Sequence, residues 1–246
     1  MIHSTIIHLP ETGSTNNYAV ELLTKERPPE GCVVVTSHQT RGKGTDTNSW
    51  ESEINKNLTF SIILYPAFAA DQQFILNKAI SLGIYDFLKT ELPQSPVSIK
   101  WPNDIYIGDK KVCGILIQNS IIGYQFDYVV AGIGLNVNQE IFISDAPNPV
   151  SLKMITKKDY NLEDVLEKLL NSIFEKYSLV QQNKGRLIEN EYYQAMYRLM
   201  EWHRYLVNKV EVTARITGTS PYGQLLLQTQ TLQELTCDLK DVKFVI

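Results

Sequence analysis

Apolar and polar residues alternate along the first two thirds of the chain in a way that predicts strands interspersed with helices. Short apolar or alternating runs predict strands over residues 4–9, 32–36, 57–65, 104–107, 112–117 and 124–133. Apolar residues at helical spacing predict helices that begin after Asn17, over 71–90, from Asn161, and over about 187–200. Residues 139–160 are expected to form a loop.

The periodicity changes near residue 204, where alternating β runs replace the helical spacing. These runs cover 209–216, 224–228 and 241–246, with a turn at Pro221-Tyr222-Gly223. A small β unit is therefore expected at the end of the chain. We divide the chain into a first domain at 1–200 and a second at 201–246.

Composition places the chain among ordinary globular proteins. Of its 246 residues, 43% are hydrophobic and 20% are charged, so it can bury a core for one full domain and a small one. The net charge of −4 argues against a general binder of nucleic acid or of anionic membranes. We therefore expect no nucleic-acid partner.

The cysteines and histidines indicate the compartment of the protein and whether it carries a structural metal site. The three cysteines are far apart and form no CxxC pair, which favours free thiols in a reducing compartment. The four histidines have no metal-ligand spacing, so no structural metal site is expected. With no signal-peptide pattern and no apolar run of membrane length, the sequence predicts a cytoplasmic protein without a membrane partner.

The stretch Ser98–Gln118 carries the most unusual chemistry. A hairpin is predicted there, with its turn at Gly108-Asp109, and it is preceded by K-W-P-N-D at residues 100–104. Because Pro102 biases Trp101 toward extended backbone, we expect Lys100 at a strand end that opens on a cavity. A surface lysine beside an edge proline is the simpler interpretation of a lone lysine here.

Three other stretches offer binding groups. Ser14-Thr15-Asn16 either caps the first helix or presents donors to a polar ligand. The polar loop 37–50 contains glycines and cations that suit a phosphate, although it is not a Walker A loop and an ordinary surface loop is equally compatible. The Gly132-Ile133-Gly134 motif lacks the third glycine of a dinucleotide-binding fingerprint.

K-W-P-N-D followed by K-x-x-G-I-L resembles the central signature of biotin–protein ligases. S-T-N at 14–16, Q-x-x-G-K-G at 39–44, G-I-G-x-N-V-N at 132–138 and the β tail also resemble that family, in the same order. The resemblance implies an α+β fold. Its catalytic domain is a mixed β-sheet with flanking helices, similar to class II synthetases, followed by a small SH3-like β-barrel.

The resemblance implies a two-step ligase reaction. Biotin carboxylate attacks the α-phosphorus of ATP, which gives biotinyl-5′-AMP and pyrophosphate. A lysine of a biotin carboxyl carrier protein then attacks the mixed anhydride and releases AMP. Biotin, ATP and Mg²⁺ are the implied substrates and cofactor, because cations must neutralise the charge that develops at phosphorus.

The family's functional residues are assigned to matching positions of this chain. Lys100 is interpreted as the catalytic lysine that contacts both biotin and ATP. The residues assigned to biotin are Ser14, Thr15, Asn16, Gln39, Gly42, Lys43, Gly44, Thr45, Lys100 and Gly114. Those assigned to ATP or the adenylate are Arg41, Lys43, Trp50, Lys100, Asn103, Asp104 and Asn136. Asp104 either holds Mg²⁺ or orients the lysine.

The loop before Trp50 departs from the family pattern. Lys43, Thr45 and Asn48 stand where family members carry arginines, and Thr47 replaces a glycine. This depletion leaves open a non-catalytic protein that binds biotin or a nucleotide. A lipoate–protein ligase or octanoyltransferase of the same fold is the alternative enzyme. A ligase-repressor is rejected because the segment before Ser14 is too short for a helix-turn-helix domain.

Overall fold

The computed structural model describes residues 5–44, 48–144 and 148–246. Within these ranges, a seven-stranded sheet has the order β1-β2-β3-β7-β6-β5-β4. β1 and β2 are parallel, and the other neighbours are antiparallel. The strands are β1 (Ile6–Leu9), β2 (Cys32–Thr36), β3 (Leu58–Leu64), β4 (Val97–Lys100), β5 (Asp104–Ile107), β6 (Lys110–Ile122) and β7 (Gln125–Leu135).

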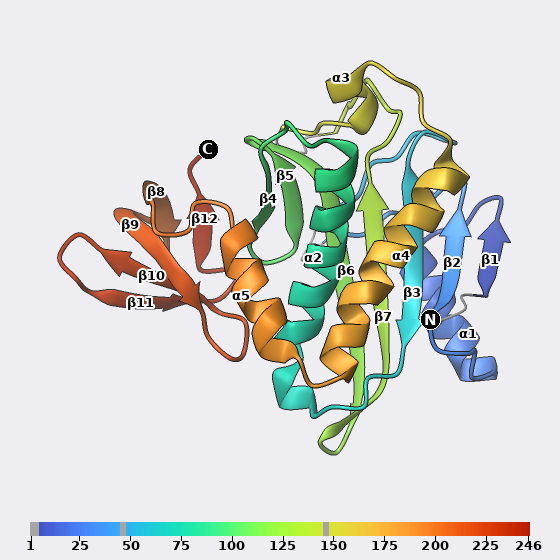
Figure 1. Ribbon diagram of the computed structural model, residues 1–246, viewed down its shortest axis with the longest axis horizontal. Coiled ribbons are helices and arrows are strands. Elements are labelled where there is room, and N and C mark those ends of the chain that lie inside the picture. The colour runs from blue at the N-terminus through green and yellow to red at the C-terminus, as the bar shows by residue number, and fades with distance from the viewer. Residues whose placement is uncertain (1–4, 45–47, 145–147) are drawn as a thin grey trace.

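Two long helices, α2 (Phe74–Glu91) and α4 (Leu162–Gln181), lie side by side across one face of this sheet (Figure 1). Helix α1 (Thr15–Lys25) contacts β2, β3 and β7, and it packs Ala19 into a second apolar cluster with Val34, Ile63 and Val130. Every residue of β2 and β3 is buried, which explains their continuous apolar runs. The remaining helices are the short 3₁₀ helix η1 (Ala70–Gln72), α3 (Leu152–Thr156) and α5 (Gly185–Ala195).

The C-terminal part forms a separate five-stranded antiparallel sheet, at the left of Figure 1, in the order β11-β10-β9-β8-β12. Its strands are β8 (Trp202–Val207), β9 (Val210–Thr219), β10 (Leu225–Thr229), β11 (Glu234–Cys237) and β12 (Val242–Phe244). Backbone of the segment 196–200 joins the two sheets. Tyr197 N donates to Ile99 O of β4 at 2.9 Å, and Met200 N donates to Ile216 O of β9 at 2.9 Å.

The predicted α+β fold, with a mixed sheet, flanking helices and a C-terminal β unit, is confirmed. The expected loop 139–160 contains α3, which begins where Ser151 Oγ accepts from Met154 N. The helix expected to reach residue 200 ends at Ala195, because the following residues pair with the two sheets. The sequence predicted no strand at the positions of β8 and β11. The domain boundary between residues 200 and 201 stays a prediction. The first strand of the second sheet begins at Trp202.

Among the described residues, no helix has the length and hydropathy needed to cross a membrane.

The close contact between α2 and α4 generates a test of the core. A Cβ built on Gly83 would lie 2.5 Å from Ile173 Cα, which is backbone and cannot rotate away. Gly83→Ala should therefore lower the free energy of unfolding by about 1–3 kcal/mol, as overpacked cores do. Gly185→Ala is the matched control, because its Cβ would meet only the Ile75 side chain, at 3.8 Å and beyond.

Denaturant unfolding followed by circular dichroism measures both variants. Gly185→Ala should leave the stability unchanged or raise it by up to about 1 kcal/mol through its effect on the unfolded chain. Equal stability of Gly83→Ala and the wild type would contradict this description of the helix contact.

Candidate functional site

The site is built over two glycines in the middle of the sheet. Gly114 of β6 pairs directly with Gly134 of β7, and the same row continues to Asp104 of β5 on one side and Thr59 of β3 on the other. Two residues further along the same two strands, on the same face, Gly132 lies opposite Leu116. Since glycines carry no side chain, the layer above these strands has a hollow between two polar flanks.

A cavity of about 50 Å³ occupies this hollow. Strands β3, β5, β6 and β7 provide its floor, and the start of α1 and the described residues of the segments 39–44 and 48–50 provide its walls. The described residues that line it are Ser14, Thr15, Asn16, Gln39, Lys43, Gly44, Trp50, Thr59, Asn103, Asp104, Lys111, Gly114, Ile115, Leu116, Gly132, Ile133 and Gly134.

One end of the cavity is a cluster of neutral hydrogen-bonding groups. Gln39 Oε1 accepts from Thr15 N at 2.9 Å, and Asn16 Nδ2 donates to Leu116 O at 3.1 Å. Ser61 Oγ lies 2.8 Å from Thr15 Oγ1 and 2.6 Å from Asn16 Oδ1, so its single proton serves one of them at a time. These contacts fix the orientation of the polar groups at this end.

Ser14 occupies the N-cap position of α1, but its side chain makes no capping hydrogen bond to the described residues. The residue is only 4% exposed. Capping therefore does not account for a buried serine here, whereas a polar ligand in the cavity would give its hydroxyl a partner.

The other end of the cavity carries charge. Lys111 Nζ lies 2.6 Å from Asp104 Oδ1, and both side chains are largely buried. The register between β5 and β6 shifts between Ile105 and Tyr106, which leaves Val112 as an extra residue. This bulge turns Lys111 to the same face as Gly114, although strict alternation would put them on opposite faces.

Trp50 closes the hollow from above. A Cβ on Gly134 would collide with the Trp50 indole, and one on Gly114 would lie 3.1 Å from Trp50 Cζ3. Lys111 Nζ lies 5.6 Å from the centroid of the indole ring. Among the described residues, Trp50 Nε1 is buried without a hydrogen-bond partner, which is costly unless an acceptor arrives.

Most of the residues singled out from the sequence line this cavity. They are Ser14, Thr15, Asn16, Gln39, Lys43, Gly44, Trp50, Asn103, Asp104 and Gly114. Gly42 and Arg41 lie beside it: Gly42 O accepts from Trp50 N at 3.0 Å, and Arg41 lines an outer groove along α1. Thr45 lies outside the described residues.

Lys100, the expected catalytic lysine, does not belong to the residues that line the cavity. It stands on the edge strand β4, and β5 separates it from β6. Its ammonium lies 4.4 Å from the ring centroid of Phe244 and 5.4 Å from that of Tyr106. The structure thus puts Lys100 at the contact with the C-terminal sheet and Lys111 in the cavity.

Asn136 also lies outside the cavity lining. Its Nδ2 donates to Val150 O at 3.1 Å and its backbone N donates to Val112 O at 2.9 Å, so it ties the segment before α3 to the sheet. Its Oδ1 is buried and has no partner among the described residues. That unpaired acceptor is the feature of Asn136 that still points to a ligand.

The sequence assignment missed Lys111, Thr59, Ser61, Gly132 and Gly134. Lys111 begins the K-x-x-G-I-L motif, so the motif already marked it as a candidate. The bulge that turns its side chain into the cavity cannot be predicted from the periodicity of the sequence. The two glycines were noted in G-I-G-x-N-V-N without being assigned to the site. Thr59 and Ser61 are hydroxyl residues at alternating positions of an otherwise apolar strand, which is a usable signal for a polar wall.

No group of three or more His, Cys, Asp or Glu side chains suited to a metal ion occurs within the described ranges. Asp104 is the one carboxylate among the described residues that line the cavity. A single carboxylate is compatible with Mg²⁺ that arrives on a nucleotide, since that ion takes most of its ligands from phosphates and water.

Comparisons with known proteins identify a matching family and similar structures. A model of the biotin/lipoate A/B protein ligase family matches residues 9–136. The bifunctional ligase/repressor BirA of Bacillus subtilis is 33% identical over 135 residues, which are 55% of this chain and 41% of that protein. The human biotin–protein ligase is 29% identical over 189 residues, 70% of this chain and 26% of that protein. The chain thus spans less than half the length of these relatives.

Among solved structures, biotin protein ligase from Aquifex aeolicus in complex with biotin and ATP is similar over nearly the whole chain. The TM-score is 0.79 at 28% identity, and the match covers 98% of this chain and 99% of that one. The likeness therefore includes the C-terminal sheet as well as the region that the family model matches.

The surroundings of Lys100 generate a pH-dependent prediction. Burial lowers the pKa of its ammonium, Lys111 and Arg198 lower it further, and Asp104 opposes them. Because the pKa of Lys100 is lower in the folded chain than in the unfolded chain, the unfolded chain binds more protons at pH values between these two pKa values. The wild type should therefore gain stability relative to Lys100→Met as pH rises toward 10.5. Urea unfolding at pH 7 and at higher pH measures the difference, and a pH-independent difference would contradict the burial of the charge.

Proposed function

The chain belongs to the biotin/lipoate A/B protein ligase family, and we propose that it activates biotin with ATP and transfers it to a lysine of a biotin carboxyl carrier protein. One observation carries the proposal. A single cavity has a neutral hydrogen-bonding cluster at one end and the Lys111–Asp104 pair at the other. The fold of the chain supports the same proposal, because it is similar over nearly its full length to a biotin protein ligase described with biotin and ATP.

The neutral end suits the ureido ring of biotin. That ring has N–H donors and a carbonyl acceptor but no charge, and it needs partners of both kinds when it is buried. Ser14, Thr15 and Gln39 supply hydroxyl and amide groups to the cavity lining, and Asn16 adds a further amide. The glycine floor leaves room for the flat bicyclic ring to lie against the backbone.

Lys111 is the lysine that we assign to adenylation, in place of Lys100. The carboxylate and the α-phosphate are both anionic, so a cation between them is needed to bring them together. Lys111 meets this requirement from the cavity wall, and Asp104 orients its ammonium at 2.6 Å. The carboxylate oxygen then bonds to the α-phosphorus, the bond to pyrophosphate breaks, and biotinyl-5′-AMP results.

The nucleotide would occupy the side of the cavity covered by Trp50. A cavity of about 50 Å³ is smaller than ordinary ligand pockets of roughly 300 Å³ or more, so the indole must move when substrates enter. In its new position it would offer a face to adenine, and Asn103 and Asn136 would approach the nucleotide. Lys43 and Arg41 would face its phosphates, and Mg²⁺ arriving on those phosphates near Asp104 would supply charge neutralisation.

In the second step the ε-amino group of the carrier lysine attacks the carbonyl carbon of the mixed anhydride. An amide forms, and AMP leaves with the bonding electron pair while the amine loses a proton. We assign the acceptor to the biotin carboxyl carrier class from the family resemblance, and an activated biotin carboxylate is the electrophile that a carrier lysine requires. The three described cysteines are free and buried, which is compatible with a reducing cytoplasmic setting.

Biotin-dependent exchange between ATP and labelled pyrophosphate tests the proposal directly. The wild-type protein should catalyse exchange with biotin and much less with lipoate. Exchange that prefers lipoate would instead identify a lipoate ligase. Tight binding of labelled biotin without any exchange would identify a non-catalytic biotin-binding protein.

The assignment of Lys111 generates a paired prediction. Lys111→Met should lower the exchange rate by about 100-fold or more, the scale for removing a transition-state contact, whereas Lys100→Met should lower it by less than about tenfold. The two substitutions remove the same charge from β4 and β6, the two strands that flank β5, so each serves as the control of the other. The exchange assay at saturating ATP measures both rates.

Circular dichroism must show both variants folded. The opposite ranking, with Lys100→Met inactive and Lys111→Met active, would return the catalytic role to Lys100.

A further inference from the structure

The turn between β4 and β5 faces two parts of the molecule at once. Trp101 is 3% exposed, and its Nε1 donates to Gly223 O of the C-terminal sheet at 2.7 Å. Two and three residues later, Asn103 and Asp104 line the cavity. A contact with the second sheet is thus separated from the site by only two peptide units.

The Gly223 end of this contact is held in place. Segment Thr219–Gln224 connects β9 to β10, and its turn is closed by hydrogen bonds from Gly223 N to Ser220 O and from Ser220 N to Gln224 O, both 2.9 Å. Gly223 has a φ of +89°, and a Cβ there would lie 2.5 Å from Phe74 Cδ2 of α2. Only glycine fits both requirements, so the carbonyl that accepts the hydrogen bond from Trp101 has a fixed position.

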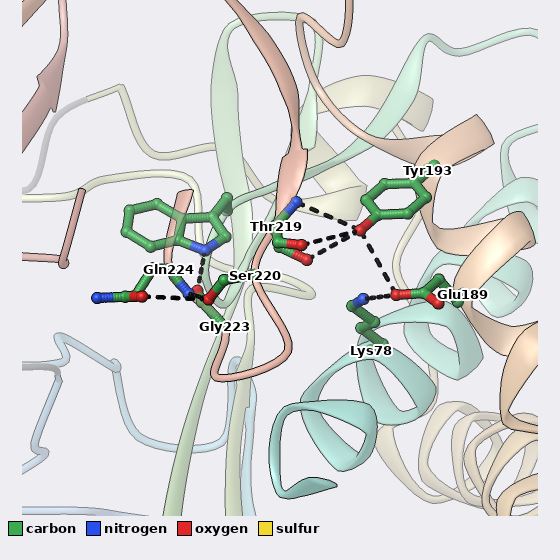
Figure 2. Close-up of polar contacts among 8 residues, drawn as sticks. Lys78, Glu189, Tyr193, Thr219, Ser220, Gly223 and Gln224 are labelled. Atoms are coloured by element: carbon green, nitrogen blue, oxygen red, sulfur yellow. Dashed lines mark hydrogen bonds and ion pairs between the residues drawn. The ribbon is translucent and has the colours of Figure 1, made fainter. Parts of the chain in front are cut away.

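A second contact holds the same segment from the opposite side. Tyr193 Oη of α5 lies 3.0 Å from Thr219 Oγ1 and accepts from Thr219 N at 3.2 Å. Figure 2 shows this tyrosine between Thr219 and the ion pair of Lys78 with Glu189, whose atoms lie 2.6 Å apart. These groups belong to α2 and α5, and none of them lines the cavity.

Asn103 and Asp104 depend on the position of this turn. Ile115 N donates to Asn103 O at 2.9 Å, and Asn103 Nδ2 donates to Ile115 O. These bonds tie the turn to β6, next to Gly114 of the glycine floor. Asp104 in turn orients Lys111. A shift of the Trp101 indole would therefore change the position of the Lys111 ammonium, because the backbone from Trp101 to Asp104 and the Asp104–Lys111 ion pair connect them.

We propose that Trp101 is a positioning residue: its hydrogen bond to Gly223 uses the C-terminal sheet to hold Asn103 and Asp104, and through them Lys111, in the geometry for adenylation. This role rests on the proposed function, because it acts on the lysine assigned to that step. Trp101 itself does not line the cavity, so its effect is on the rate of the step more than on biotin affinity.

The competing explanation is that Trp101 only anchors the C-terminal sheet. The matched pair Trp101→Phe and Tyr193→Phe separates the two, because each variant keeps an aromatic ring and loses hydrogen bonding to the same segment. Trp101→Phe should lower kcat for pyrophosphate exchange by about tenfold to a hundredfold, the scale for a small misplacement, and change KM for biotin by less than about threefold. Tyr193→Phe should change neither by more than about twofold.

Gly223→Ala displaces the same carbonyl without changing Trp101. It should lower kcat to a similar extent, and the double variant Trp101→Phe/Gly223→Ala should be little worse than either single variant, as expected for two changes in one contact. Additive losses in the double variant would contradict a shared action through this bond.

Hydrogen exchange of the Ile115 amide provides a readout that does not depend on the reaction. Its protection should fall in Trp101→Phe and stay as in the wild type in Tyr193→Phe. Equal kcat losses in the two variants, or unchanged protection in Trp101→Phe, would overturn the positioning role. Absence of exchange activity in the wild type would reject the proposed function, whereas the amide measurement would still decide whether Trp101 holds the turn.

Discussion

The backbone pairing of Gly114 with Gly134 creates the space on which the whole site depends. Elsewhere in the sheet, neighbouring strands fill both faces with side chains, and β2 and β3 are buried at every position. At this pair neither strand contributes a side chain, and the Trp50 indole lies against the bare backbone. The opposite face is covered by α2 and α4, so the strands cannot move inward to close the gap (Figure 1).

The chemistry of the site follows from what flanks the two glycines. Toward β3 the flanking groups are hydroxyls and amides, and toward β5 they are Asp104 and Lys111. A ligand that lies along this row therefore meets neutral partners at one end and a cation at the other. This polarity supports the proposal that the ligand is biotin, with its uncharged ureido ring at the neutral end and its carboxylate at the cation.

The sequence predicted the fold well because the apolar periodicity is strong in the long helices and buried strands. It failed where tertiary pairing overrides local pattern: residues 196–200 continue a helical spacing but pair with β4 and β9. The sequence also assigned adenylation to Lys100, whereas we propose Lys111, which lines the cavity. A motif names residues without giving their direction, and the bulge at Val112 that turns Lys111 toward Gly114 has no signature in composition or spacing.

The direct test of this account is a calorimetric titration of biotin into the wild type and Gly134→Ala. A methyl group at this position would collide with Trp50 in the free protein and occupy the floor of the cavity. The account predicts one biotin bound per wild-type chain and affinity weakened by at least about tenfold in the folded variant, the lower end of the cost of overpacking. Equal affinity of the two proteins would contradict it, because biotin would then bind away from the glycine floor.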